Sequence, residues 1–572
     1  MTNAALDISI GDTLALLDSD FAEFAAGVAN DQYAVWLGAG ISLAKLPGLE
    51  GVVQIVLEHL QARVGLTNPN CIFRRSLDRI LGLINLTADE WKEADYAKPI
   101  ADWRDRERIC KNLTSAYARM LDQHPQGMDP DYLVWTAIDV VGRYGDPAIT
   151  PGPEHLGLAA LIAEGAACDT ASANWDPLIE RATEHLAGAT PGLLQVRILP
   201  DDVKDNSARA RLYKFHGCAV LAGTGGAAYR EKIVGRASQI HGWEKKGENK
   251  VIAGKLLDLA ISKSTLMLGL STQDTNIQTI FVGAQENLPT SFPTHPPAVV
   301  LSENAVGPDQ VSLLQNFYKT DYAAKTQAIE NSALLRSYGR SLLPALWLHV
   351  VCAKLEAFVT VAAPVLPSPD IDKLRAALRD LRDGAAFAAA ASSQEDYMLG
   401  ALPVAGRTIS LFRDGKPLEP AAGVYTPLSI NCVAKSLADP NLPSSGLPQL
   451  ALAAALLGHG QATGAWSCSI SDPANPKSGA VRVAGKVQAA EVFFAANTQA
   501  ANRIVADGRA AENDNAIIVH SHQIPPAAPR NPKAAPGRIL PRGRREISLA
   551  SLGDGATDLN ALFMRFKSEI RL

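Results

Sequence analysis

A glycine-rich segment follows an apolar run near the start of the chain. The run YAVWL (33–37) leads directly into Gly38, Ala39, Gly40, Ile41 and Ser42. Glycine in such a turn lets backbone amides approach a pyrophosphate, and the positive end of a following helix favours that charge. The segment PGLEGVVQIVLEHLQARV (47–64) opens on proline and predicts this helix. We therefore predict a phosphate-binding turn. A purely structural turn is the alternative, because the third glycine of the usual dinucleotide motif is missing.

Two short polar side chains follow a second apolar run. The segment ACDTASAN (167–174) ends at Asn174, and Asp176 comes two residues later. Side chains after a parallel strand lie at the ligand-binding edge of the sheet, and an asparagine amide can hold a water molecule or a ribose hydroxyl. The alternative is structural, since Asp176 also suits the cap of the helix predicted over WDPLIERATEHL (175–186).

A histidine and a serine–aspartate pair end two further runs. In RLYKFHGCAV (211–220), His216 precedes a glycine, and a neutral imidazole there can accept a proton from a hydroxyl near neutral pH. The run STLMLGLS (264–271) ends with Gly269, Leu270 and Ser271, and Asp274 follows. This second turn suits a ribose or a phosphate. The structural alternatives are a core histidine and an ordinary helix cap.

Strand and helix patterns alternate around these motifs. Further strand-like runs are LLQVRILP (193–200) and PAVVLS (297–302), with helical stretches such as ENKVIAGKLLDLAIS (248–262) between them. Alternation of this kind predicts an α/β fold with a Rossmann-like parallel sheet covered by helices on both faces. We place an N-terminal helix at 1–30 and the sheet domain at 31–362, with a helical insertion at about 70–150 and closing helices at the end. The apolar stretch 342–363 contains His349, Lys354 and Glu356, so we predict a buried helix and no membrane span.

Taken together, the order of the four motifs resembles the sirtuin superfamily. The resemblance covers residues 30 to about 305, and it implies that residues 38–42 bind the diphosphate of NAD. It further implies that Asn174 and Asp176 contact the nicotinamide ribose, that His216 is the catalytic base, and that residues 269–271 and Asp274 bind the adenosine end.

The departures from protein-deacylating sirtuins bear on the substrate. Here LAKLPGLEGVV (43–53) replaces their GIPDFR stretch, the two CxxC pairs of their zinc module are absent, and ASANWD replaces TQNID. The sequence therefore lacks the features that bind a peptide substrate in those enzymes. The pattern resembles sirtuin-like effectors of bacterial anti-phage defence, which hydrolyse NAD to ADP-ribose and nicotinamide without a metal. A protein deacylase and a non-catalytic NAD or ADP-ribose sensor are the alternatives.

Beyond a proline-rich break at 363–370, residues 371–572 predict a smaller mixed α+β domain. A helix is expected over 372–391, and strands over 407–418, 424–433, 465–472, 479–487 and 490–496. The family resemblance implies a sensor or partner-binding role, with self-assembly, a short Argonaute or a helicase-like ATPase as candidate partners. The basic, proline-rich arm 524–545, from Arg530 to Arg545, could contact nucleic acid or be a solvated loop. His520 and His522 lie two apart on a strand without further ligands nearby, so no metal is predicted.

Composition narrows the remaining function classes. The chain has 572 residues and a net charge of −5, so no overall attraction to nucleic acid is expected. Its seven cysteines are scattered and odd in number, which favours a reducing compartment over a disulfide framework. The first residues lack the pattern of a signal peptide. We therefore expect a cytoplasmic protein.

Overall fold

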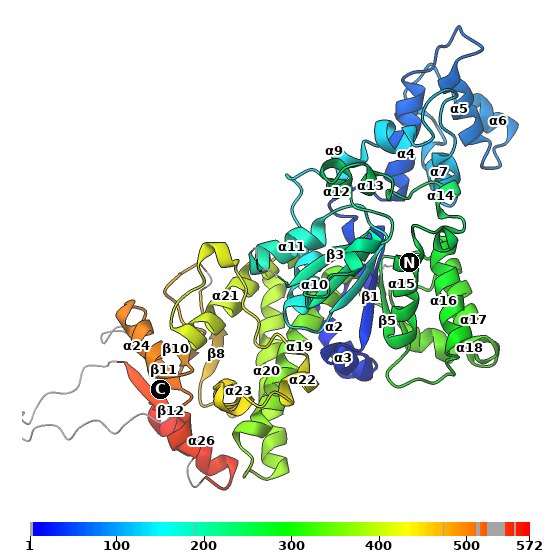
Figure 1. The fold of residues 1–572 in the computed structure, drawn as a ribbon. Helices are drawn as coiled ribbons and strands as arrows, with labels where there is room; N and C mark the ends of the chain where they lie inside the picture. Colours follow the sequence, from blue (N-terminus) through cyan, green and yellow to red (C-terminus); the bar gives the residue numbers. More distant parts are fainter. Residues whose placement is uncertain are drawn as a thin grey trace, which may run out of the picture.

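A central sheet of seven parallel strands organises the N-terminal two thirds of the chain (Figure 1). The computed structural model describes residues 4–188, 190, 192–472, 474–510, 515–522, 544–553 and 556–572. The strands lie in the order β3-β4-β2-β1-β5-β6-β7. They are β1 (Tyr33–Leu37), β2 (Asp169–Ser172), β3 (Leu194–Arg197), β4 (Ala210–Lys214), β5 (Ser264–Leu268), β6 (Val299–Ser302) and β7 (Leu334–Leu335). The predicted α/β class with its parallel sheet is confirmed, and only the short β7 was not predicted.

The register of the sheet brings the ends of four strands together. Leu37 of β1 pairs with Ser172 of β2 on one side and with Leu268 of β5 on the other. Ser172 in turn pairs with Lys214 of β4. The chain runs from β1 to one side of the sheet and later returns to the other side at β5, and such a reversal leaves a crevice at the carboxyl ends of the strands.

Helices cover both faces of the sheet, and the strand residues alternate between two cores. Tyr33, Val35 and Leu37 pack in one core, whereas Ala34 and Trp36 pack in the other. The first core takes side chains from α2 (Ile10–Asp18), α3 (Ala22–Ala29) and α10 (Pro153–Ala163). The second takes them from α15 (Lys250–Ser262), α16 (Thr275–Asn287) and α17 (Pro308–Tyr318). The single helix predicted for residues 1–30 is instead three, because α1 (Ala4–Asp7) precedes α2 and α3.

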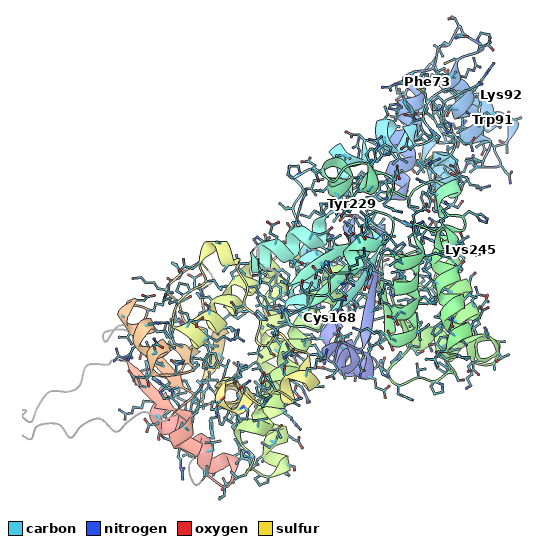
Figure 2. All side chains as sticks on the ribbon, in the orientation of Figure 1. Phe73, Trp91, Lys92, Cys168, Tyr229 and Lys245 are labelled. Atoms are coloured by element: carbon cyan, nitrogen blue, oxygen red, sulfur yellow. The ribbon has the colours of Figure 1, made fainter. Side chains whose placement is uncertain are left out.

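A helical insertion between β1 and β2 builds its own core. It contains α4 (Leu49–Gln61), α5 (Ile72–Leu81), α6 (Ala88–Glu93), α7 (Arg106–Thr114), α8 (Tyr117–Leu121) and α9 (Val140–Tyr144). Figure 2 shows Phe73, Trp91 and Lys92 at its outer end, whereas Cys168 lies beside the opposite, amino end of β2. The inner end of the insertion, with α8, reaches the carboxyl edge of the sheet.

The C-terminal region contains a second, mixed sheet of five strands. Their order is β12-β11-β10-β9-β8, with β10, β11 and β12 parallel and β8, β9 and β10 antiparallel. The strands are β8 (Ser467–Ile470), β9 (Val481–Ala484), β10 (Ala489–Ala495), β11 (Ala516–His520) and β12 (Arg545–Ser548). They lie with α20 (Ser368–Ala388), α21 (Gln394–Asp414), α23 (Leu447–Ala462), α24 (Thr498–Ala506) and α26 (Leu559–Ile570).

Two strands predicted for this region are wrong. Residues 407–414 belong to helix α21, and residues 424–432 contain no strand. In α21, Leu411 joins a core with Phe493, and Phe412 joins another with Phe494, so burial on the sheet overrides the strand-like local pattern. Most of the predicted basic arm, including Arg530, lies outside the described residues, and only its end at Arg544 and Arg545 is seen.

One long helix, α19 (Gly339–Ala362), belongs to both halves of the molecule. Leu342 and Leu346 pack in a core of the first sheet, whereas Phe358 and Val359 pack in the core of the second. Among the described helices it alone has the length and apolarity of a membrane span, and 61% of that apolar window is buried inside the structure. The domain boundary at 363–370 stays a prediction, since the two cores meet within this helix.

Candidate active site

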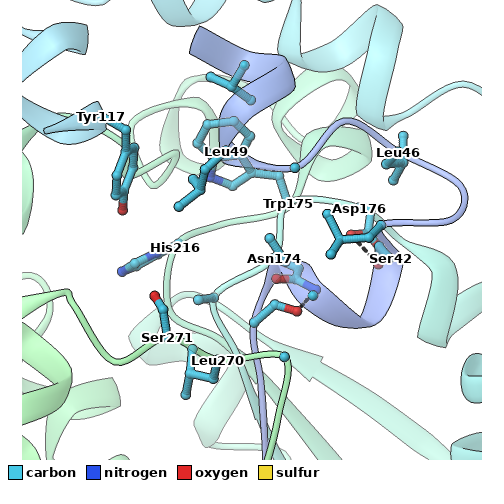
Figure 3. Close-up of a pocket in the computed structure, with 18 of the residues that line it drawn as sticks. Ser42, Leu46, Leu49, Tyr117, Asn174, Trp175, Asp176, His216, Leu270 and Ser271 are labelled. Atoms are coloured by element: carbon cyan, nitrogen blue, oxygen red, sulfur yellow. Dashed lines mark hydrogen bonds between the residues drawn. The ribbon is translucent and has the colours of Figure 1, made fainter. Parts of the chain in front are cut away.

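A cavity of about 270 Å³ lies at the carboxyl ends of β1, β2, β4 and β5 (Figure 3). Among the residues that line it are Gly38, Ala39, Gly40, Ser42, Asn174, Asp176, His216, Gly269, Leu270, Ser271 and Asp274. The structure thus brings together every predicted site residue except Ile41, whose side chain is buried in a core of the sheet. Their individual roles stay predictions.

The glycine turn uses part of its hydrogen-bonding capacity within the protein. The Gly38 and Gly40 amides donate to the carbonyls of Leu268 and Gly269, at 3.1 and 3.0 Å. The Ala39 amide is the exception, because it has no hydrogen-bond partner among the described residues, and Ala39 is exposed. A short 3₁₀ helix, η1 (Ala39–Ser42), follows directly, and α4 begins only later. Of the amides of Gly38, Ala39 and Gly40, only that of Ala39 is therefore free to meet a phosphate, and phosphate binding by residues 38–42 stays a prediction.

Replacing Gly40 with alanine is expected to lower the free energy of unfolding by about 1–3 kcal/mol. A Cβ at this position would lie 2.5 Å from the Gly269 Cα, so the turns after β1 and β5 would have to separate. Chemical denaturation measures this change. Gly254 is the control, since a Cβ there meets nothing within 4 Å. Because Gly254 lies within helix α15, Gly254→Ala is expected to leave stability unchanged or slightly higher. Equal effects of both substitutions would contradict the prediction.

Asn174 ties the second strand end to the first. Its side-chain Nδ2 donates to the Gly38 carbonyl at 3.0 Å, and its backbone amide donates to the Ser172 Oγ at 3.1 Å. The Asn174 Oδ1 receives no hydrogen bond from a described residue. The amide is therefore fixed in place by its nitrogen, and its oxygen stays available to a ligand in the cavity.

Asp176 is held by a chain of hydrogen bonds that starts at the backbone of Gly152. The Gly152 amide donates to His155 Nδ1 at 3.0 Å, which leaves the ring proton on Nε2. This Nε2 lies 3.2 Å from Ser42 Oγ, which donates onward to Asp176 Oδ2 at 3.1 Å. Burial lowers the pKa of His155 to about 3, so the ring is neutral. Asp176 Oδ1 also accepts from the Leu178 amide at the start of α11 (Leu178–Ala187), although the cap position of this helix is Pro177 and not Asp176 as the structural alternative predicts.

Lys214, two residues before His216, holds the loop after β2 in place. Its Nζ is buried and donates to the Asp176 carbonyl at 2.5 Å and to Glu180 Oε1 at 2.8 Å. The lysine therefore fixes the backbone that carries Asn174 and Asp176, while His216 two residues later lines the cavity itself.

His216 is buried and hydrogen-bonded to a residue that the sequence did not single out. Asn276 Nδ2 lies 3.1 Å from His216 Nε2, and Asn276 is itself buried. Burial lowers the pKa of His216, so the ring is neutral at pH 7. With the amide nitrogen donating, the ring proton sits on Nδ1. The Asn276 Oδ1 accepts from the Ile277 amide at 2.9 Å, which holds the side-chain amide in this orientation. Asn276 therefore decides which ring nitrogen is basic.

The insertion supplies an apolar roof over these polar groups. Tyr117 from α8 donates from its hydroxyl to Asp274 Oδ1 at 2.7 Å, which fixes the roof to the turn after β5. The remaining roof is apolar and consists of Leu46, Leu49, Val52, Leu121, Tyr144 and Trp175. None of the residues lining the cavity, all of which the structure describes, is a lysine or an arginine. A bound phosphate would therefore be met by amides and hydroxyls.

A parallel sheet with a cavity where its strand order reverses is the arrangement that α/β nucleotide-binding proteins use. Residues 170–323 match the family model described as SIR2-like domain. The match spans Asn174, Asp176, His216 and the turn after β5, whereas the turn after β1 precedes it. Residues 170–323 are therefore similar to SIR2-like domains, which supports an NAD-related function. No curated protein matches it significantly.

The two C-terminal histidines lie close together outside this site. The ring centroids of His520 and His522 are 5.5 Å apart. Within the described ranges, no group of three His, Cys, Asp or Glu side chains is placed to hold a metal ion. The expectation of a metal-free protein stays a prediction.

Proposed function

We propose that this protein is an NAD⁺ glycohydrolase, which converts NAD⁺ and water into ADP-ribose, nicotinamide and a proton. The observation that carries the proposal is that Asn174 and His216, from the ends of different strands, line one cavity together with the turn after β1. A ribose held in this cavity would be within reach of both side chains.

The free groups of the cavity fit the parts of this substrate. The Ala39 amide can donate to the diphosphate, and Asn174 Oδ1 can accept from a ribose hydroxyl or a water molecule. Cleavage breaks the bond from the ribose C1′ to the pyridinium nitrogen, and the electron pair leaves with neutral nicotinamide. Water adds to C1′, and neutral His216 accepts its proton at Nε2, where this proton replaces the hydrogen bond from Asn276.

The apolar cover of the cavity is consistent with water, and not a peptide, as the nucleophile. Apolar side chains of the insertion and of residues 46–52 cover the side of the cavity opposite the polar strand ends. The zinc module that supports an acyl-lysine peptide in deacylases is missing from the sequence, whereas a water molecule needs no such groove. Exclusion of bulk solvent would also strengthen the electrostatic contribution of the fixed dipoles.

Asn174→Ala is expected to lower nicotinamide release by about 10²–10³-fold, because one fixed polar contact to the ribose or water is lost. Purified protein is incubated with NAD⁺, with and without an acetyl-lysine peptide, and nicotinamide is followed. Release without peptide supports the hydrolase. Release only with peptide would favour the deacylase, and tight binding without release would favour the sensor. Asn331→Ala, at an exposed position of α18 (Thr320–Ala333), is the matched control and should retain full activity.

We further propose that the reaction depletes NAD in anti-phage defence, in the cytoplasm, and is gated by self-assembly or by a partner that contacts the C-terminal region. The resemblance to defence effectors and the added C-terminal region support this role. Toxicity of the expressed protein, relieved by Asn174→Ala, would agree with it. Unchanged cellular NAD during phage infection of cells that carry the protein would contradict it.

A further inference from the structure

A second cavity, of about 890 Å³, lies apart from the candidate active site. Its walls come from the N-terminal helices, from the loop at Lys45, from the start of α10 and from the segment joining α20 to α21. It shares no lining residue with the first cavity. None of its residues is used by the proposed reaction.

Glu154 gives this cavity an unpaired carboxyl group. The residue is 5% exposed, lines the cavity, and accepts no hydrogen bond from the side chain or backbone of another described residue. His155 Nδ1 lies 3.4 Å from a Glu154 oxygen. This nitrogen carries no proton to donate, because the ring is neutral and Nδ1 accepts from the Gly152 amide. The carboxyl accepts a hydrogen bond from its own backbone amide, and no group of another described residue compensates its desolvation.

The charges around Glu154 favour a positively charged ligand. The cavity is lined by five carboxyl groups, those of Asp7, Asp12, Glu154, Asp383 and Glu395. Only two basic side chains line it, and both are engaged. Lys45 pairs with Glu395 at 2.9 Å, and Arg340 donates to Gln394 at 2.7 Å. Neither basic group forms a hydrogen bond with Glu154.

An exposed aromatic ring lies on the same wall. Phe387 of α20 is 80% exposed and lines the cavity beside small apolar residues such as Ala386 and Ala390. The face of a phenyl ring attracts an ammonium group, and the apolar wall suits methylene groups. Carboxyl groups beside an aromatic and aliphatic wall are the recognition chemistry of an aliphatic amine.

We propose that this cavity binds an aliphatic polyamine, with one ammonium group on Glu154 and the carbon chain along Phe387. The site does not depend on the proposed hydrolase activity. Hydrogen bonds nevertheless link it to the first cavity, because Glu154 precedes His155, which contacts Ser42, and Ser42 donates to Asp176.

The expected pH dependence follows from the groups that face Glu154. Burial raises the pKa of Glu154 to about 7. Its own backbone amide, Lys45 and Arg340 oppose this rise, and Glu395 adds to it. His155 is neutral and adds no charge. A bound ammonium favours the ionised carboxylate, so binding should tighten as the pH rises through about 7 while the amine stays charged.

Calorimetric titration of the full chain with spermidine tests the site. Glu154→Gln, which keeps the shape and removes the charge, is expected to weaken binding by at least about tenfold. Phe387→Ala changes an exposed side chain, so it should fold normally and also weaken binding. Glu303→Gln is the control, since burial likewise raises the pKa of Glu303 to about 7 but the residue lies outside this cavity.

The same titration can overturn the proposal. Absence of spermidine binding to the wild-type chain at millimolar concentration would do so, as would equal affinities for the wild type and Phe387→Ala. Thermal denaturation checks that Glu154→Gln is folded. If that variant is unfolded, Phe387→Ala and the pH series decide the question alone, because neither replaces a buried side chain. This experiment measures spermidine binding and not NAD hydrolysis. Its result therefore does not depend on whether the proposed hydrolase activity is correct.

Discussion

His216→Ala is expected to lower nicotinamide release by about 10²–10⁴-fold, the range attributed to a positioned general base. The imidazole lines the cavity, is neutral because burial lowers its pKa, and is oriented by Asn276 at 3.1 Å. Alanine removes the proton acceptor and keeps the strand ends that form the cavity. The loss should therefore appear in kcat, while the affinity for NAD⁺ measured by titration changes little.

The pH profile of the wild-type protein checks the same assignment. A base must be unprotonated, so activity should fall as the pH drops through the pKa of His216. Because burial lowers this pKa, the fall should occur at a more acidic pH than the usual value of about 6.5 for histidine. His295→Ala is the matched control, since this exposed histidine pairs with Glu23 far from the cavity. Full activity of His216→Ala would contradict the proposed role.

Much of the first sheet could be predicted because its strands are buried on both faces. A strand such as β1, with Val35 in one core and Trp36 in the other, appears in the sequence as a short continuous apolar run. The convergence of the site could be predicted for a related reason. Carboxyl ends of parallel strands share one edge, so Asn174, His216 and Gly269 had to lie near Gly38 once the sheet was assumed.

The residues that the sequence did not reveal act through contacts between distant segments. Tyr117 reaches Asp274 from the insertion, and His155 reaches Ser42 from the start of α10. Each occurs in an ordinary helical pattern, and no local spacing distinguishes it from a core residue. The use of the Gly40 amide by Gly269 was hidden for the same reason, since it depends on how closely β1 and β5 approach each other.

The C-terminal region was predicted less well because its local patterns are ambiguous. Residues 407–414 contain the strand-forming types Thr408, Ile409 and Phe412, yet they form the last turns of α21. That helix begins at a serine cap, Ser393, whose side chain accepts from the Asp396 amide. This serine and the acidic residues after it are a helix-start signal, which favours the observed helix over short strands.

Lys354→Met is expected to lower the free energy of unfolding of the protein by about 3–5 kcal/mol. The substitution leaves the buried carboxylate of Glu164, at the contact between the two halves, without its positively charged partner. Lys354 Nζ on α19 donates to Glu164 Oε2 at 2.5 Å and to the Ser429 carbonyl at 2.7 Å. Glu164 Oε1 also accepts from the Tyr425 hydroxyl and the Leu428 amide. Both side chains are fully buried, so water cannot replace the lost ammonium group.

The double variant Lys354→Met with Glu164→Gln tests whether the unpaired charge of Glu164 causes the loss of stability. Since the second change removes the stranded charge while a glutamine oxygen can still accept from Tyr425 and Leu428, most of the lost stability should return. Urea denaturation measures all variants. Lys373→Met is the control, because its ion pair with Asp370 at 3.0 Å holds an exposed lysine and is expected to contribute at most about 1 kcal/mol. A double variant no more stable than Lys354→Met would instead mean that the lost hydrogen bonds of Lys354 to the Glu164 and Ser429 carbonyls, and not the unpaired charge, cause the destabilisation.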